Sequence, residues 1–149
     1  MDKWDIRFAE LAKTLAGWSS CFKEDRQIGA VIVRDKRILT TGYNGAPAGI
    51  KSCKERGECL RRKLNIESGT RAEFCYAVHA EQNALIQAAR LGLAVKDATL
   101  YCTHYPCSIC AKLIVNAGIA RVVYINDYPD AFAKQILAEG GVAVEQLAL

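Results

Sequence analysis

The chain has 149 residues, which is a usual length for one domain and leaves little material for a second independent core. Hydrophobic residues make up 51% of it, yet no apolar run approaches the roughly 20 residues that a membrane-spanning helix needs. The net charge is +4, and residues 51–63, with six basic and two acidic residues, carry an excess of the same size. This segment surrounds two cysteines and is unlike the basic face with interleaved aromatic residues that binds nucleic acids. Because the charged opening is no secretory signal, the sequence predicts one cytoplasmic domain over residues 1–149, without a membrane partner, and argues against a nucleic-acid partner.

The first third of the chain predicts a helix followed by a hairpin. Apolar residues recur at three- and four-residue spacing from Asp2 to Gly17, which is typical of one face of an amphipathic helix. Residues 28–43 form two β-rich runs split by the turn-prone sequence RDKR, so they predict a β-hairpin. The glycine- and proline-containing loop NGAPAG follows.

Residues 50–75 form a polar, charged and cysteine-bearing insertion, with at most a short helix at residues 60–65. A loop of this length in a small domain indicates an element with a function, or one held in place by a ligand. From Ala80 the pattern is strongly helical and closes at Gly92.

The second half of the chain alternates strands and helices. The predicted elements are a strand at residues 97–103, a helix at 107–118, a strand at 120–125, a helix at 128–141 with Pro129 near its first turn, and a last strand or tail at 142–147. Such alternation predicts an α/β sheet with helices on both faces.

Two short motifs, HAE and PCSIC, each stand where a strand or loop passes into a predicted helix. Cys107 and Cys110 lie three apart in a first helical turn, so their sulfurs point to the same side, where the helix dipole favours thiolates. His79 would complete three protein ligands for zinc and leave the fourth position to water, as in catalytic zinc sites. Glu81 could then take a proton from that water and hand it to a leaving ammonia.

Each of these features alone has an ordinary structural explanation. A lone CxxC pair is more often structural, a lone histidine is usually a satisfied polar residue, and a glutamate in a first helical turn offsets the helix dipole. Their combination at two loop-to-helix junctions favours a catalytic zinc site. It matches the H-x-E…P-C-x-x-C pattern of zinc nucleobase deaminases.

Beyond this motif, the chain resembles the cytidine deaminase-like superfamily and, within it, the deoxycytidylate (dCMP) deaminase family. Four stretches carry the resemblance over most of the chain: IGAVIVRDKRILTTGYNGAPAG, VHAEQNAL, LYCTHYPCSICAKLIVNAGI and VVYINDYPD. His79 argues against nucleoside-level cytidine deaminases, in which a cysteine stands there, and GYNG with the long insertion argues against tRNA adenosine deaminases. The resemblance implies a three-layer α/β/α fold around a mixed sheet of about five strands. It also implies zinc-dependent hydrolysis of dCMP to dUMP and ammonia, which supplies dUMP for thymidylate synthesis.

The resemblance implies further residues that contact a substrate. The carboxamide of Asn44 would contact the deoxyribose, and the backbone around Ala80 would bind the pyrimidine carbonyl. Tyr105 is expected to line the base pocket, with a core aromatic residue as the alternative. Arg26 and Tyr128 are the candidates for the phosphate, which needs cationic or donor groups, although both positions are also compatible with plain surface residues.

Five cysteines remain besides the PCSIC pair, and without a secretory signal they predict metal ligands or thiols rather than disulfides. Cys102 stands in a predicted strand and is expected to be a small buried residue. Some members of the resembled family carry a second zinc in the regions where the other four occur. We therefore expect a second, structural zinc whose four thiolates are offset by the basic insertion, with free thiols as the alternative. The candidate ligands are Cys21, Cys53, Cys59 and Cys75.

Two other hypotheses remain open. The chain could deaminate another cytosine or adenine nucleotide or a tRNA, or it could be a non-catalytic zinc-binding interaction module that contacts single-stranded nucleic acid or a competence apparatus through the basic insertion. Glu81 argues against the module, because a structural zinc needs no carboxylate there. The resemblance finally implies a homohexamer that dCTP activates, with Mg²⁺ as a candidate companion of this effector, and that dTTP inhibits.

Overall fold

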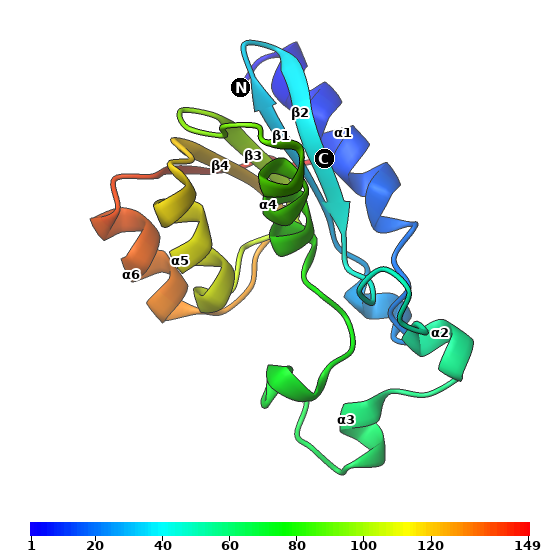
Figure 1. Ribbon diagram of the computed structural model, residues 1–149. Helices are drawn as coiled ribbons and strands as arrows, with labels where there is room; N and C mark the ends of the chain where they lie inside the picture. Colours follow the sequence, from blue (N-terminus) through cyan, green and yellow to red (C-terminus); the bar gives the residue numbers. More distant parts are fainter.

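A mixed five-stranded sheet forms the middle layer of the structure (Figure 1), a computed structural model that describes residues 1–149 apart from the side chain of residue 24. Its strands are β1 (Gly29–Arg34), β2 (Arg37–Tyr43), β3 (Thr99–His104), β4 (Arg121–Asn126) and β5 (Ala143–Gln146). They are ordered β2-β1-β3-β4-β5, with β1 antiparallel to both neighbours and with β3, β4 and β5 parallel. The mixed sheet expected from the sequence is confirmed.

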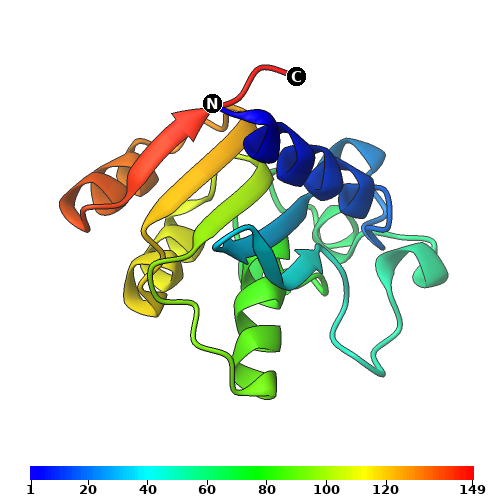
Figure 2. The same ribbon diagram turned by 90° about the horizontal axis from the view of Figure 1, so that it is seen from above.

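Helices cover both faces of this sheet (Figure 2). α1 (Lys3–Ala16) lies on one face, and α4 (Ala80–Leu91), α5 (Ser108–Ala117) and α6 (Ala131–Glu139) lie on the other. Since successive residues of a strand point to opposite faces, Val31 of β1 packs under α1 while Ile32 packs under the other three helices. The predicted three-layer α/β/α architecture is therefore confirmed. Within the described part of the chain, no helix combines the length and the apolar character needed to span a bilayer.

The predicted hairpin closes with a tight turn between β1 and β2. Asp35 and Lys36 have φ values of +52° and +60°, in the left-handed region that a type I′ turn requires at both central positions. This turn matches the twist of the two strands, so β2 runs back along β1 and brings the following loop to the same end of the sheet as the start of β1.

The insertion at residues 50–75 extends beyond that end of the sheet (Figure 1) and holds two one-turn helices, α2 (Cys53–Arg56) and α3 (Leu60–Lys63). The sequence predicted only the second. α2 forms because Ser52 and Glu55 cap each other reciprocally, and it ends at Gly57 in the left-handed conformation, with φ +70°.

The last helix, expected from residue 128, begins later than predicted. Asp130 is its N-cap and accepts a hydrogen bond from the amide of Ala133 (2.9 Å), so Pro129 precedes the helix instead of lying in its first turn. Asp130 also accepts from the amide of Ser108 (2.9 Å), the first residue of α5. One carboxylate therefore fixes the starts of two neighbouring helices.

A buried carboxylate ties α1 to the sheet. Asp5 is only 6% exposed, and Arg121 of β4 donates to its two oxygens at 2.8 and 3.3 Å. The hydroxyl of Tyr101 on β3 donates to the same carboxylate at 2.7 Å. The hydrogen bond from Arg121, against the effect of burial, lowers the pKa of Asp5 to about 2. This contribution to stability is present above the unfolded-state pKa of about 4 and is lost as the pH falls toward 2.

We expect the Arg121→Met variant to lose roughly 2–3 kcal/mol of unfolding free energy at pH 7, because a buried carboxylate then lacks its charged partner. The difference from wild type should shrink as the pH falls from 4 to 2, where the Asp5 of the wild-type protein becomes protonated. Denaturant unfolding at pH 7, 4 and 2.5 measures both effects. Arg90→Met, at an exposed position of α4, is the control. Equal stability of the wild type and Arg121→Met at pH 7 would contradict the assignment.

Candidate active site

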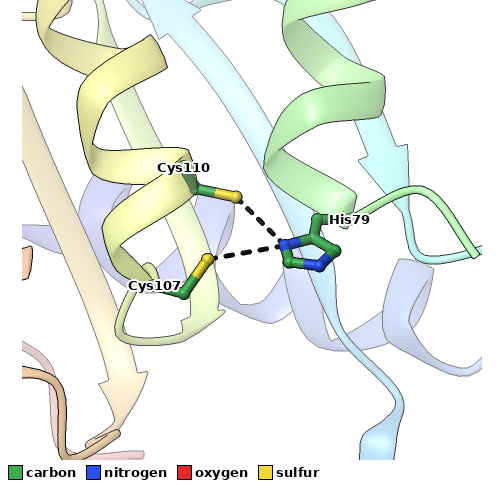
Figure 3. A group of neighbouring side chains, drawn as sticks. All are labelled: His79, Cys107 and Cys110. Carbon is green, nitrogen blue, oxygen red and sulfur yellow. Dashed lines mark hydrogen bonds between the residues drawn. The ribbon is translucent and has the colours of Figure 1, made fainter. Parts of the chain in front are cut away.

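Three potential metal ligands meet where α4 and α5 begin. His79 immediately precedes α4, Cys107 immediately precedes α5, and Cys110 lies in the first turn of α5. The ligand atoms of the three side chains all lie within 4.8 Å of one another. Nδ1 of His79 lies 3.3 Å from the sulfur of Cys110 and 3.5 Å from that of Cys107 (Figure 3).

The local sequence explains this convergence. Cys107 and Cys110 are three residues apart across the helix start, so both sulfurs project from one side of α5. On α4 the side chain of Gln82 accepts a hydrogen bond from the amide of His79 (2.9 Å), which fixes the backbone from which the imidazole projects. Both loop-to-helix junctions predicted from the sequence are therefore confirmed as junctions, and they lie side by side.

The donor set fits zinc. A tetrahedral ion bound by sulfur at about 2.3 Å and nitrogen at about 2.0 Å holds those atoms about 3.6 Å apart, close to the two distances seen here. Without a cation only one of the two cysteines is ionised. A hydrogen bond from Cys110, together with His79, lowers the pKa of Cys107 to about 4. The same hydrogen bond and burial raise the pKa of Cys110 far above its usual range. A divalent cation is the charge that would stabilise both thiolates.

Glu81 lies against this group from the first turn of α4. Its side chain is only 4% exposed, and its Oε2 accepts a hydrogen bond from the thiol of Cys110 at 3.4 Å. Burial raises the pKa of this carboxyl and so favours its protonated form. The arrangement therefore places a buried carboxyl beside the three potential metal ligands.

The centre opens into a cavity of about 350 Å³, within the range of small-molecule sites. Four of the predicted substrate residues line it, namely Asn44, Tyr105, Arg26 and Tyr128. Ala80 is the first residue of α4, and its buried side chain belongs to the core, so only its backbone is available for the contact predicted there. Tyr105 combines both expected roles, because it lines the cavity and also packs edge-on against Tyr124 at 4.8 Å between ring centres.

The carboxamide of Asn44 is already engaged within the protein. Its Oδ1 accepts from the amide of Ile28 (2.9 Å), and its Nδ2 donates to the carbonyl of Arg26. One N–H and one lone pair remain for a ligand. Asn44 therefore also holds the segment before β1 against the cavity.

Sequence reasoning did not single out several other residues of the cavity wall, among them Lys23, Arg61 and His104. Lys23 lies in a segment without periodicity, so the sequence contains no signal for it. Arg61 belongs to the basic run that was interpreted as a counter-charge for cysteines. His104 ends β3, two residues before PCSIC, and its pKa is lowered by burial and by the charge of Arg26.

The four cysteines expected to bind a second zinc line the same cavity. Burial and then the neighbouring thiols of Cys75, Cys21 and Cys59 raise the pKa of Cys53, so the four sulfurs surround a common region. Across the described side chains, however, only the first centre brings its ligand atoms close enough together to hold an ion in this conformation. Cys102 is buried within β3, as predicted.

The fold and the His79, Cys107 and Cys110 group together match the pattern of the zinc nucleobase deaminase class. The family model described as "Cytidine and deoxycytidylate deaminase zinc-binding region" matches residues 2–126. The chain belongs to this family.

Individual relatives agree with that assignment. The chain is 39% identical over 144 residues to the deoxycytidylate deaminase of Schizosaccharomyces pombe, with 96% of this chain covered, and it spans only 44% of that relative's length. It is 44% identical over 126 residues to the deoxycytidylate deaminase of Mycobacterium phage D29, covering 81% of this chain and 93% of the relative. Among solved structures, the dCMP deaminase of cyanophage S-TIM5 in complex with dCMP and dUMP has a TM-score of 0.77 and 31% identity, and 99% of each chain is covered.

We expect Cys110→Ser to lose the metal at this centre, because serine does not provide the thiolate that zinc prefers. Metal analysis of the purified protein should show about one zinc per chain fewer than in the wild type. Cys102→Ala is the matched control, since it removes another buried thiol without touching the centre. Unchanged zinc in Cys110→Ser would exclude this residue as a ligand.

Proposed function

We propose that the chain catalyses the hydrolytic deamination of dCMP to dUMP and ammonia. The observation that carries the proposal is the buried carboxyl of Glu81, 3.4 Å from the sulfur of Cys110, inside a cavity that His79 and Cys107 also line. A purely structural zinc centre needs neither a buried carboxyl nor a cavity. The relatives' names and the nucleotides in the cyanophage complex support dCMP as the substrate.

In this proposal His79, Cys107 and Cys110 hold zinc, which supplies a Lewis acid that lowers the pKa of a bound water toward 7. Glu81 would move both protons of the attacking water in turn: its carboxylate takes the first and gives it to N3 as the oxygen bonds to C4, and it then takes the second from the hydroxyl on C4 and gives it to the 4-amino group as the C4–N bond breaks. The amino group then leaves as ammonia, so that dCMP and water give dUMP and ammonia. The raised pKa of Glu81 suits both directions of this transfer.

The remaining side chains of the cavity would orient the nucleotide. Asn44 would use its free N–H on the deoxyribose, and Tyr105 would pack against the base. Arg26 and Tyr128 would contact the phosphate, while the backbone at Ala80 would meet the pyrimidine carbonyl. Each of these contacts is a proposal that rests on the cavity and on the resemblance to the family.

The test of this function compares the wild type with Glu81→Gln on dCMP, cytidine, dCTP and an adenosine-containing tRNA stem-loop, with ammonia release as the readout. The wild type should turn over dCMP selectively, and a zinc chelator should abolish the activity. Glu81→Gln should keep its zinc and lose about 10²–10⁴-fold in kcat, because an amide cannot carry the proton.

Each other outcome has a distinct meaning. Turnover of another substrate would keep the chemistry and overturn the choice of dCMP. No ammonia release from any of the four substrates, although zinc is bound, would favour the interaction module. Loss of zinc from Glu81→Gln would show that Glu81 holds the metal rather than the proton.

We also propose that Cys21, Cys53, Cys59 and Cys75 bind a second, structural zinc. All four line one cavity, and the other three thiols raise the pKa of Cys53, which supports a common site. The pKa of Cys59 favours ligation: burial opposes ionisation, but the amides of Arg62 and Arg61 and the charges of Lys23 and Arg61 lower the pKa. Four thiolates on Zn²⁺ form a closed tetrahedral site.

We therefore expect about two zinc ions per wild-type chain and about one in the Cys53→Ser/Cys59→Ser double variant. The double variant should also unfold at a lower temperature, because the insertion would no longer be held by a bound metal ion. The measurements are metal content and thermal unfolding, with Cys102→Ala again as control. One zinc per wild-type chain, with full activity that the double variant retains, would overturn the second site.

Assembly and regulation are further proposals from the resemblance: a homohexamer, dCTP with Mg²⁺ as activator and dTTP as inhibitor. An exposed aromatic pair beside the loop that follows β2 supports a subunit contact at this surface. Trp18 is 63% exposed and packs edge-on against Tyr43, which precedes the loop that starts at Asn44. Subunit contact would cover these rings.

A further inference from the structure

Three cationic side chains line the cavity of the candidate active site, and they come from separate parts of the chain. Lys23 and Arg26 flank a short 3₁₀ turn before β1, and Arg61 comes from α3 in the insertion. Among the side chains that the structure describes, no carboxylate lies within 4.0 Å of any of the three; the ion pairs found lie elsewhere. The described side chains of the cavity wall also include the carboxyl groups of Asp25 and Glu81, but neither is paired with one of the three cations.

Lys23 is the most deeply placed of these cations. It is only 8% exposed, which is unusual for a lysine because an ammonium group is costly to remove from water. Such groups are normally paired. Since Lys23 lines the cavity, an anion bound in the cavity is a partner within its reach.

Arg61 also has a polar group without a partner. One terminal nitrogen donates to the carbonyl of Thr70 (3.0 Å), but its Nε is buried and finds no acceptor among the described groups. A buried donor without an acceptor costs about 1–3 kcal/mol. A ligand oxygen in the cavity would remove that cost.

A single turn of the insertion, residues 67–70, organises two of the cations. The hydroxyl of Ser68 accepts a hydrogen bond from Arg26 at 2.8 Å, and two residues later the carbonyl of Thr70 accepts from Arg61. The turn is closed by the amide of Thr70 donating to the carbonyl of Glu67 (3.1 Å). Both guanidinium groups are thus held in place before a ligand arrives, which reduces the entropy lost on binding.

We propose that Lys23 and Arg61 bind the phosphate of the substrate together with Arg26, and that the insertion thereby selects a nucleoside monophosphate over a nucleoside. The inference rests on the proposed function and assigns its phosphate contacts. A phosphate carries close to two negative charges at neutral pH and offers three terminal oxygens, which suits two guanidinium groups and one ammonium group. Arg61 belongs to the insertion and lines the cavity, so the selectivity resides in a segment outside the catalytic motif.

The test uses Arg61→Ala and Lys23→Met, each compared with Arg62→Ala. Arg62 is the neighbour of Arg61 on the same helical turn, but it is exposed and is not part of the cavity wall, so its removal subtracts the same charge from the insertion. Steady-state kinetics with dCMP and with deoxycytidine, zinc content, and calorimetric binding of dUMP and deoxyuridine are measured for every variant.

We expect KM for dCMP to rise at least about tenfold in Arg61→Ala and in Lys23→Met, with kcat within about twofold of the wild type. Affinity for dUMP should fall by a similar factor, affinity for deoxyuridine should not change, and zinc content should stay constant. Arg62→Ala should behave as the wild type. Arg61→Lys should recover part of the dUMP affinity, because it restores the charge without the bidentate geometry.

A loss of zinc, or equal losses on nucleotide and nucleoside, would overturn the proposal and leave the two cations as counter-charges for the cysteine cluster. Equal losses in Arg61→Ala and Arg62→Ala would overturn it as well, since only general charge would then matter. The binding measurements separate this inference from the proposed function. If the wild type binds dUMP through Arg61 but releases no ammonia from dCMP, the phosphate site stands and the deaminase activity fails.

Discussion

The position of the candidate active site depends on one close contact, between Gly42 of β2 and the first turn of α4. A Cβ atom at Gly42 would lie 2.2 Å from the carbonyl oxygen of Ala80 and 2.7 Å from the amide nitrogen of Ala84. Only a strand residue without a side chain lets the helix backbone lie this close to the sheet. Because His79 is the N-cap of α4 and Glu81 lies in its first turn, this contact positions both side chains relative to the sheet. Cys107 and Cys110, at the start of α5, lie close to His79 because α4 packs this near to the sheet.

The candidate metal centre could be predicted from the sequence because its parts are local. The spacing of Cys107 and Cys110 defines which way their sulfurs point once a helix starts there, and the same holds for His79 and Glu81. What joins the two motifs is the parallel placement of two helices on one face of the sheet, and alternating strands and helices predict that placement. The start of the last helix was predicted too early because Asp130, not Pro129, is the residue that caps it.

The remainder of the cavity was harder to predict, and the reason is physical. Lys23 and Arg61 stand in segments without hydrophobic periodicity, so the flanking sequence does not predict the direction of their side chains. Their position follows from long-range contacts such as that between Arg26 and Ser68, 42 residues apart. The capping box of Ser52 and Glu55 predicts only that α2 forms, not that residues of the insertion line the cavity.

The charges of the site explain why the cations come from outside the catalytic motif. Two thiolates and one imidazole on Zn²⁺ are neutral overall, so the metal centre itself provides little attraction for a nucleotide, and the carboxyl of Glu81 repels a phosphate whenever it is ionised. Cations placed directly beside His79 and Cys107 would favour the thiolates but would also compete with the metal for them. Placed on the insertion and on the segment before β1, they can hold the phosphate of a ligand whose base reaches the zinc. Two of these cations, Lys23 and Arg61, also lower the pKa of Cys59, so the proposed phosphate site and the ionisation of this cysteine depend on the same charges.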